Sequence, residues 1–149
     1  MAGAAFAAID STAGAAAPKT QIALLGVTGA RAKVRGFRIG NTAATSAGGN
    51  RFVLNRVSTA GTATTITAAD TKLDLNSPAP VTVATSTFTA EPTSGIGIED
   101  VGFDRVGTYI LWYPPGSEPF VVGTGRIALQ KTVGTETDVL AGTVVWEES

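Results

Sequence analysis

Polar and apolar residues alternate along this chain in short runs separated by turn signals, a pattern that predicts β-strands. From residue 21 onward the runs are divided by Gly, Pro, Asn and Ser, and no run shows the 3.6-residue period of a helix. The extended runs are residues 21–27, 32–40, 51–58, 62–68, 81–89, 109–113, 120–122, 126–132 and 139–147, and a less regular segment at 96–103 follows a turn. Eight or nine strands joined in this way predict an antiparallel sandwich or barrel. Strict alternation in one of them places Ala84 and Phe88 on the same face.

Residues 1–20 differ from the rest because they are rich in Ala and Gly. They lack the basic start of a signal peptide, and Asp10 interrupts their apolar stretch, so we interpret them as a retained arm. Alanine also allows a short helix near residues 2–9. Because termini are ordered only when something holds them, we expect this extended arm to pack on neighbouring subunits through Phe6 and Ile9.

The chain is therefore predicted to have two parts, an N-terminal arm at residues 1–20 and a β-domain at residues 21–149. Deleting residues 1–18 is then expected to leave a folded β-domain that assembles less well.

Composition argues against catalysis. The 149 residues contain no histidine and no cysteine, which removes the commonest general base and all thiol chemistry. We therefore expect no enzyme activity, no cofactor and no metal. The formal net charge is −1, with no basic excess for a phosphate backbone, and no apolar run is long enough to span a membrane. Neither nucleic acid nor membrane is an expected partner. The mean hydropathy of +0.22 suggests that other subunits cover part of the surface.

The basic residues Arg31, Lys33, Arg35 and Arg38 form the largest local group of positive charge. They are interleaved with apolar residues, as on the solvated face of a strand, and this interpretation is favoured over nucleic-acid binding.

The densest acidic group is formed by Glu99, Asp100 and Asp104. Its oxygens could bind Ca²⁺, or two of the carboxyl groups could act as an acid and base pair. The spacing matches no calcium-binding loop, and Arg105 offers a charge partner next to it. A solvated loop or an inter-subunit salt bridge is therefore the favoured interpretation.

The aromatic run near residue 110 is apolar on both faces. Alternation places Tyr109, Leu111 and Tyr113 on one face, and Ile110 and Trp112 on the other. A strand packed on both sides, in a core and against another subunit, has this pattern. A sugar-binding aromatic platform is the alternative.

Three aromatic residues of this run, Tyr109, Trp112 and Tyr113, are therefore candidates for an interface. Trp146, in the last run of the chain, is equally compatible with the core and with an interface.

The order of the motifs resembles that of a known family of proteins. The motifs are FRIGN at 37–41, TATTITAAD at 62–70, VTVATSTFTAEP at 81–92, YILWYPPGSE at 109–118 and GTVVWEE at 142–148. Together, over residues 21–149, they resemble the small jelly-roll decoration, or cement, proteins of tailed-bacteriophage capsids.

This resemblance implies a fold and a role. The expected fold is all-β, an antiparallel jelly-roll-like sandwich of about eight strands with an extended N-terminal arm. The implied role is a homotrimer that binds the phage major capsid protein on the outer surface of the virion, after assembly in the host cytoplasm. It would stabilise the head against the internal pressure of its DNA, and no chemistry is implied.

Three other functions remain open from the sequence. The chain could be a carbohydrate- or receptor-binding β-module of a virion spike, or another structural component of the head or tail. An enzyme that uses Glu99 and Asp104 as a carboxylate pair is the third alternative.

Overall fold

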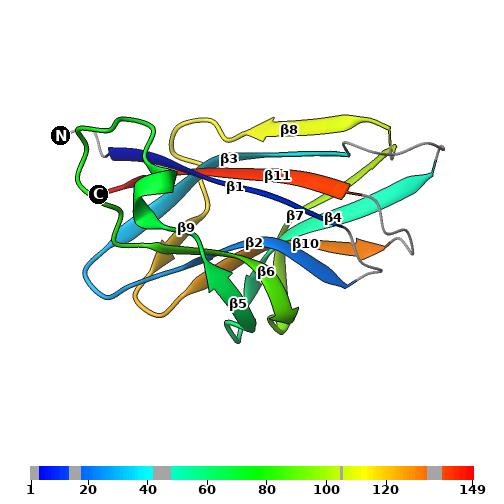
Figure 1. The fold of residues 1–149 in the computed structure, drawn as a ribbon, viewed down its shortest axis with the longest axis horizontal. Helices are drawn as coiled ribbons and strands as arrows, with labels where there is room; N and C mark the ends of the chain where they lie inside the picture. The colour runs from blue at the N-terminus through cyan, green and yellow to red at the C-terminus, as the bar shows by residue number, and fades with distance from the viewer. Residues whose placement is uncertain (1–3, 14–17, 42–47, 105, 134–138) are drawn as a thin grey trace.

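The chain folds into two antiparallel β-sheets that pack face to face in a computed structural model (Figure 1). The structure describes residues 4–13, 18–41, 48–104, 106–133 and 139–149. The elements are β1 (Ala4–Ala13), β2 (Lys19–Leu25), β3 (Arg31–Asn41), β4 (Gly49–Val57), β5 (Thr62–Thr65), the short 3₁₀ helix η1 (Ala68–Thr71), β6 (Val83–Ala90), β7 (Ser94–Asp104), β8 (Thr108–Trp112), β9 (Phe120–Val122), β10 (Arg126–Val133) and β11 (Val139–Glu148). Within the described residues, no helix is long and apolar enough to cross a membrane.

The strand order is that of a jelly roll with three added strands. Sheet 1 has the order β1-β11-β3-β8, with β9 also paired to β3, and sheet 2 has the order β5-β6-β2-β10-β4-β7. Eight strands remain when β5, β6 and β9 are left out. Counted along the chain, the first (β1), eighth (β11), third (β3) and sixth (β8) form one sheet. The second (β2), seventh (β10), fourth (β4) and fifth (β7) form the other. This is the jelly-roll order. The predicted all-β antiparallel sandwich is confirmed, but the described residues form eleven strands rather than about eight.

The first described residues form a strand of the sandwich itself. β1 pairs with β11 along its whole length, from Ala4 opposite Glu148 to Ala13 opposite Val139. The predicted division between an arm and a β-domain at residue 20 is therefore wrong, because Ala4–Ala13 belongs to the sandwich. The alternative of a short helix near residues 2–9 is also wrong where β1 is described. The small Ala side chains do not indicate a strand, because alanine has a low preference for β-structure. The strand that pairs with this segment is also more than a hundred residues away in sequence. Contact of this strand with another subunit remains a prediction.

The core lies between the two sheets. Its largest fully buried side chains are Trp146, Phe6, Phe37, Phe52, Ile22, Leu24, Ile39, Leu54, Ile127, Leu129 and Leu140. Burying each such side chain contributes about 1.5–3 kcal/mol, so this layer is the main source of stability.

Strand β6 crosses from the core to the far side of sheet 2. Ala84 packs in the main core, whereas Phe88 packs in a second apolar cluster with Ala23 and Ala128. The predicted common face for Ala84 and Phe88 is therefore wrong. The cause lies between them, because Thr87 has a φ of 53° and so reverses the alternation.

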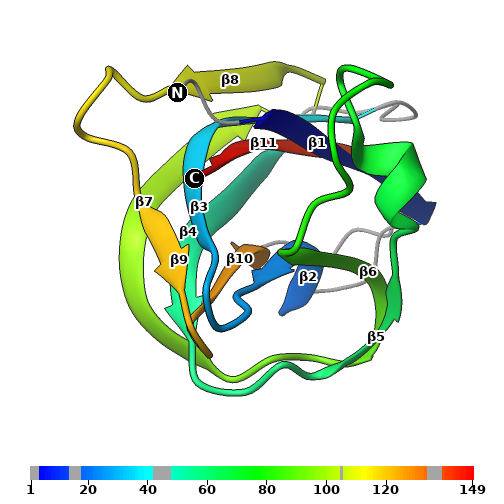
Figure 2. The same ribbon diagram turned by 90° about the vertical axis from the view of Figure 1, so that its left-hand side faces the viewer.

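The chain covers the outer face of sheet 2 with its own segments. Figure 2 shows the segments before β5 and after β6 running beneath β2 and β10. There Gln130 Nε2 donates to Thr20 Oγ1 at 2.8 Å, while Gln130 Oε1 accepts from Asn55 Nδ2 at 2.7 Å and from Ser94 Oγ at 2.8 Å. Buried polar groups that are paired in this way hold the covering segments in place.

Candidate interaction surface

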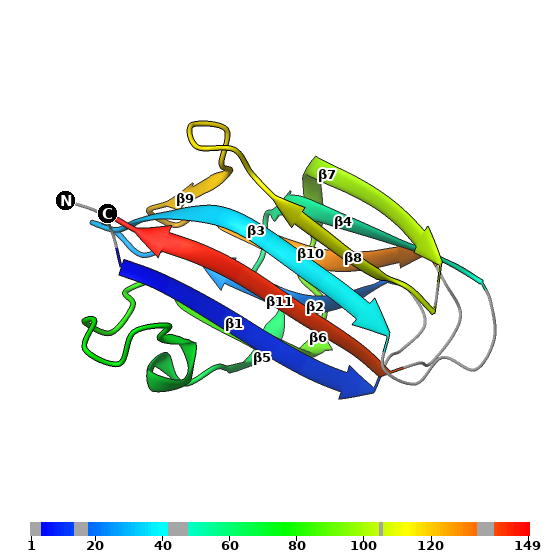
Figure 3. The ribbon, with the colours of Figure 1, turned by 90° about the horizontal axis from the view of Figure 1, so that it is seen from above.

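The outer face of sheet 1 is not covered in this way, and in Figure 3 no described segment passes over the middle of β11 or β3. We call this surface the open face. The strand register defines rows of outward-pointing side chains across this face. Three rows lie in its middle: Ile9, Thr143, Arg38 and Ile110; Ala7, Val145, Gly36 and Trp112; and Ser11, Ala141, Gly40 and Thr108. A fourth row, Ala5, Glu147, Lys33 and Phe120, carries two charged residues.

A groove of about 530 Å³ lies on the open face. Its most exposed apolar side chains are Ile9, Leu73, Ile110 and Trp112, of which Trp112 is 60% exposed. Leu73 comes from the loop after η1, and the other three come from β1 and β8 at opposite sides of the sheet. Large apolar side chains gathered in this way on one face are typical of an interaction site.

The floor of the groove is flat because its central residues are small. A Cβ atom added to Gly36 would lie only 2.6 Å from Cε3 of Trp112, so the indole ring lies directly across this glycine. The glycine thus allows the indole of Trp112 to lie close against the sheet while the residue remains 60% exposed.

Arg38 is the only charged residue in the three rows. It forms no ion pair within the described residues. A second hollow of about 280 Å³ continues from the groove and shares Ile9, Arg38 and Thr143 with it. The second hollow is more polar, since Asn41, Thr108 and Thr143 also line it. A guanidinium group at the edge of the apolar groove is suited to a carboxylate on an otherwise apolar partner.

Two of the six predicted interface residues, Ile9 and Trp112, lie together on the open face. Tyr109 and Tyr113 instead face inward and pack against the core, as the alternation in this strand requires.

Phe6 and Trp146 are inside the sandwich, with ring centroids 5.6 Å apart, and are not accessible to another subunit. The prediction that Phe6 contacts another subunit is therefore wrong, and for Trp146, which the sequence left open between core and interface, the structure shows the core. Sequence reasoning missed Leu73 and Arg38, because only the fold brings them to the groove.

Tyr113 is part of the structural interior. Burial is the main cause that raises the pKa of its phenol, and the nearby Glu99 and Tyr109 raise it further. Its hydroxyl is buried without a hydrogen-bond partner among the described residues. A phenol whose ionisation is disfavoured in this way is a poor acid or base near neutral pH.

The acidic group does not converge on a site. Arg51 Nε donates to Asp100 Oδ1 at 2.8 Å, and this hydrogen bond lowers the pKa of the Asp100 carboxyl. Asp104 Oδ1 accepts the backbone N–H of Val106 at 3.0 Å. The charge partner of Asp100 thus comes from the same chain, and the predicted partner Arg105 lies outside the described residues. No three Asp or Glu side chains in the described part of the chain could hold a metal ion.

Glu99 and Asp104 are also too far apart to act as a pair. Both lie on β7, five positions apart in a stretch of regular pairing with β4, so their Cα atoms are about 16 Å apart. The carboxyl groups of glycosidases lie roughly 5–10 Å apart. The geometry gives this pair no common substrate position.

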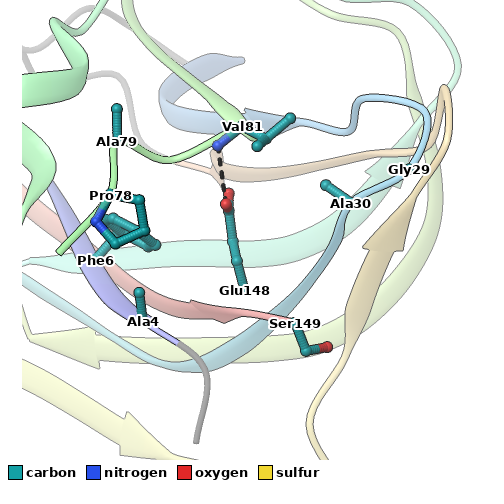
Figure 4. A pocket seen from close by; sticks show the side chains of 9 residues that line it. All are labelled: Ala4, Phe6, Gly29, Ala30, Pro78, Ala79, Val81, Glu148 and Ser149. Atoms are coloured by element: carbon teal, nitrogen blue, oxygen red, sulfur yellow. Dashed lines mark hydrogen bonds between the residues drawn. The ribbon is translucent and has the colours of Figure 1, made fainter. Parts of the chain in front are cut away.

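A further hollow, of about 270 Å³, lies beside the chain termini and is occupied by a structural carboxylate (Figure 4). Glu148 accepts the backbone N–H groups of Val81 at 2.9 Å and Thr82 at 2.7 Å. Trp146 Nε1 also donates to it, at 3.3 Å. Glu148 therefore fastens the segment before β6 to the end of β11, and among the described residues that line the hollow it is the one acidic or basic side chain.

Comparison of the chain with protein-family models, curated proteins and solved structures found no match.

Proposed function

We propose that this chain is a structural virion protein, a homotrimeric decoration or cement protein that binds the major capsid protein on the outer surface of a tailed-phage head. The observation that carries the proposal is the groove of the open face, which is mostly apolar and contains Arg38, an arginine that forms no ion pair within the described residues. The jelly-roll order and the sequence resemblance over residues 21–149 support the same function.

The mechanism is additive burial of surface. Four strands about 4.8 Å apart give a sheet face of roughly 500 Å², which is comparable to one side of a modest protein interface. Each trimer presents this surface three times, so weak contacts combine into strong attachment. Subunits of the shell that are bridged in this way resist separation when DNA presses from inside.

The test is binding to heads of the source phage from which this protein has been removed. The variant Trp112→Asp places a charge on the open face, and Ile96→Asp is the matched control because Ile96 is an exposed apolar residue of sheet 2. Wild type and Ile96→Asp should bind and raise the temperature at which heads rupture, whereas Trp112→Asp should do neither. Equal binding by all three, or no binding by wild type, would contradict the proposal.

A carbohydrate-binding module is the second candidate, because Trp112 presents a ring face beside the hydroxyl of Thr143 and the guanidinium of Arg38. Titration with host-surface glycans should then quench the fluorescence of Trp112. A cryo-EM map of the virion distinguishes both candidates from another head or tail component by copy number and ring symmetry.

A further inference from the structure

We propose that a basic patch at the β9 border of sheet 1 receives the acidic turn at residues 74–76 of a second copy of this chain, and that three copies close a ring through this contact. The inference rests on the homotrimer of the proposed function and names the two surfaces that meet within it. The groove takes no part in this contact and stays free for the capsid.

Two arginines flank an exposed aromatic ring at the β9 border. The Cζ atom of Arg31, on β3, lies 4.3 Å from the centroid of the Phe120 ring, and the Cζ atom of Arg56, on β4, lies 5.8 Å from it. Arg56 Nη1 also donates to the backbone oxygen of Phe120 at 3.1 Å, so this side chain reaches from sheet 2 to sheet 1. We call Arg31, Phe120 and Arg56 the border patch. Guanidinium groups held by a ring and a carbonyl lose little freedom when they bind an anion.

The positive charge of the border patch is not neutralised by the described residues. Arg31 and Arg56 are both exposed, and neither forms an ion pair within the part of the chain that the structure describes. The carboxylate of Glu118, close to the patch in sequence, pairs with Arg35 instead. Val122, on the same strand as the ring, is 46% exposed. Guanidinium groups beside exposed apolar side chains suit a partner that carries a carboxylate next to an apolar side chain.

The turn after η1 carries that combination. Leu75 is 84% exposed, the highest value among the exposed large apolar residues, and Asp74 next to it is exposed and forms no ion pair within the described residues. Asn76 N donates to Asp74 Oδ1 at 2.9 Å and Ser77 N donates to Asp74 O at 3.0 Å, so the turn is formed before it binds. Lys72, earlier in the loop, is half-buried where the loop pairs with β1.

The two surfaces are separate from one another and from the groove. Figure 2 and Figure 3 place β9 and the loop after η1 on opposite sides of the sandwich, and Figure 3 shows both toward the end that holds the chain termini. Neither residues 74–76 nor the border patch lines the groove.

Contact between two different surfaces of one chain is head-to-tail, and it forms a closed ring when the rotation between neighbours allows closure. Because both surfaces lie toward one end of the molecule, successive copies are turned around that end, which suits a small ring. Each subunit uses its turn once and its border patch once, and all three grooves remain accessible.

Sedimentation equilibrium of the full-length chain tests the contact, with circular dichroism to verify folding. Wild type should have three times the chain mass of 15.0 kDa at micromolar concentration. Arg56→Glu, Asp74→Arg and Leu75→Asp should each weaken assembly roughly 10- to 100-fold. Arg38→Glu is the matched control, because it reverses an exposed arginine of the groove, and it should leave the trimer intact. The double variant Arg56→Glu/Asp74→Arg should regain the trimer, whereas Arg56→Glu/Asp104→Arg, with the same net charge, should not.

Recovery in the first double variant alone is the decisive result, because neither misfolding nor a change in net charge produces it. A wild-type trimer that Arg56→Glu leaves intact, or that the exchanged pair does not restore, overturns the contact but leaves the proposed function in place. A wild-type monomer overturns both the contact and the homotrimer, and binding of that monomer to heads would preserve only the attachment to the capsid.

Discussion

At the scale of single residues, Phe6 and Ile9 show how one strand serves two purposes. They lie three positions apart on β1 and point to opposite faces of sheet 1. Phe6 stacks on Trp146 in the core and is 1% exposed, whereas Ile9 lies on the open face and is 67% exposed. Both are apolar, so their types do not reveal the difference between them.

Replacing each residue with alanine should separate these roles. Phe6→Ala removes a fully buried ring and should lower the free energy of unfolding by about 3–5 kcal/mol. Ile9→Ala is the matched control on the same strand and should change it by less than about 0.5 kcal/mol in dilute, monomeric protein. Urea denaturation measures both values. Equal effects of the two substitutions would show that β1 is not part of the core.

Glu118 is a residue whose charge should contribute to stability. Its carboxylate accepts the backbone N–H of Gly116 at 2.6 Å and pairs with Arg35. Its own backbone N–H is the main cause that lowers the pKa of Glu118, and Gly116, Arg35 and Lys33 lower it further, against the opposing effect of burial.

The stability that Glu118 contributes should therefore depend on pH. Because its pKa is lower in the folded chain than its ordinary value of 4.5, the contribution is complete above that value and is lost as the pH falls through the folded pKa. Melting temperatures between pH 3 and 7 should fall more steeply at the acidic end for wild type than for Glu118→Gln. Parallel curves would mean that the carboxylate does not contribute to folding.

At the scale of elements, β1 and β6 depart most from what the sequence predicts. An Ala-rich segment becomes the edge strand of sheet 1 because β11 provides a complementary backbone and Trp146 provides a surface for Phe6. In β6, the backbone of Thr87 moves Phe88 to a different cluster. In both cases a distant partner, rather than local preference, decides the outcome.

Removing β1 should consequently unfold the domain. Deletion of residues 1–13 exposes the ring of Trp146 and leaves β11 with an unpaired backbone edge, which favours aggregation. We expect loss of the cooperative thermal transition by circular dichroism, whereas deletion of residues 1–3 serves as the control and should retain it. A truncated chain that melts at the wild-type temperature would restore the arm as a separate part.

At the scale of the whole molecule, the fold joins the two ends of the chain. β1 pairs with β11, and every described strand of sheet 1 lies far in sequence from the strands with which it pairs. Folds dominated by such distant pairings form slowly because long loops must close before the contacts are made.

Refolding should therefore take milliseconds to seconds, and Trp146 can report it. In the variant Trp112→Phe, Trp146 is the single remaining tryptophan, and it is fully buried against Phe6. Its fluorescence in a stopped-flow experiment should change together with the far-UV circular dichroism. A change in Trp146 that clearly precedes the gain of sheet would show that the chain ends meet before the sandwich forms.

The sequence by itself determined the β class and much of the strand pattern. Alternation in the run from Tyr109 to Tyr113 correctly separated Tyr109, Leu111 and Tyr113 from Ile110 and Trp112. This information is local, because the side-chain period of a strand is set by its own backbone.

Only the tertiary structure decided which apolar face remains open. The described segments fold over the outer face of sheet 2 and leave the outer face of sheet 1 uncovered, and the fold brings Ile9, Leu73 and Trp112 to one groove although they are far apart in sequence. It also places Trp146 in the core rather than at a surface. Burial depends on which distant segments meet, and no periodicity within a single strand contains that information.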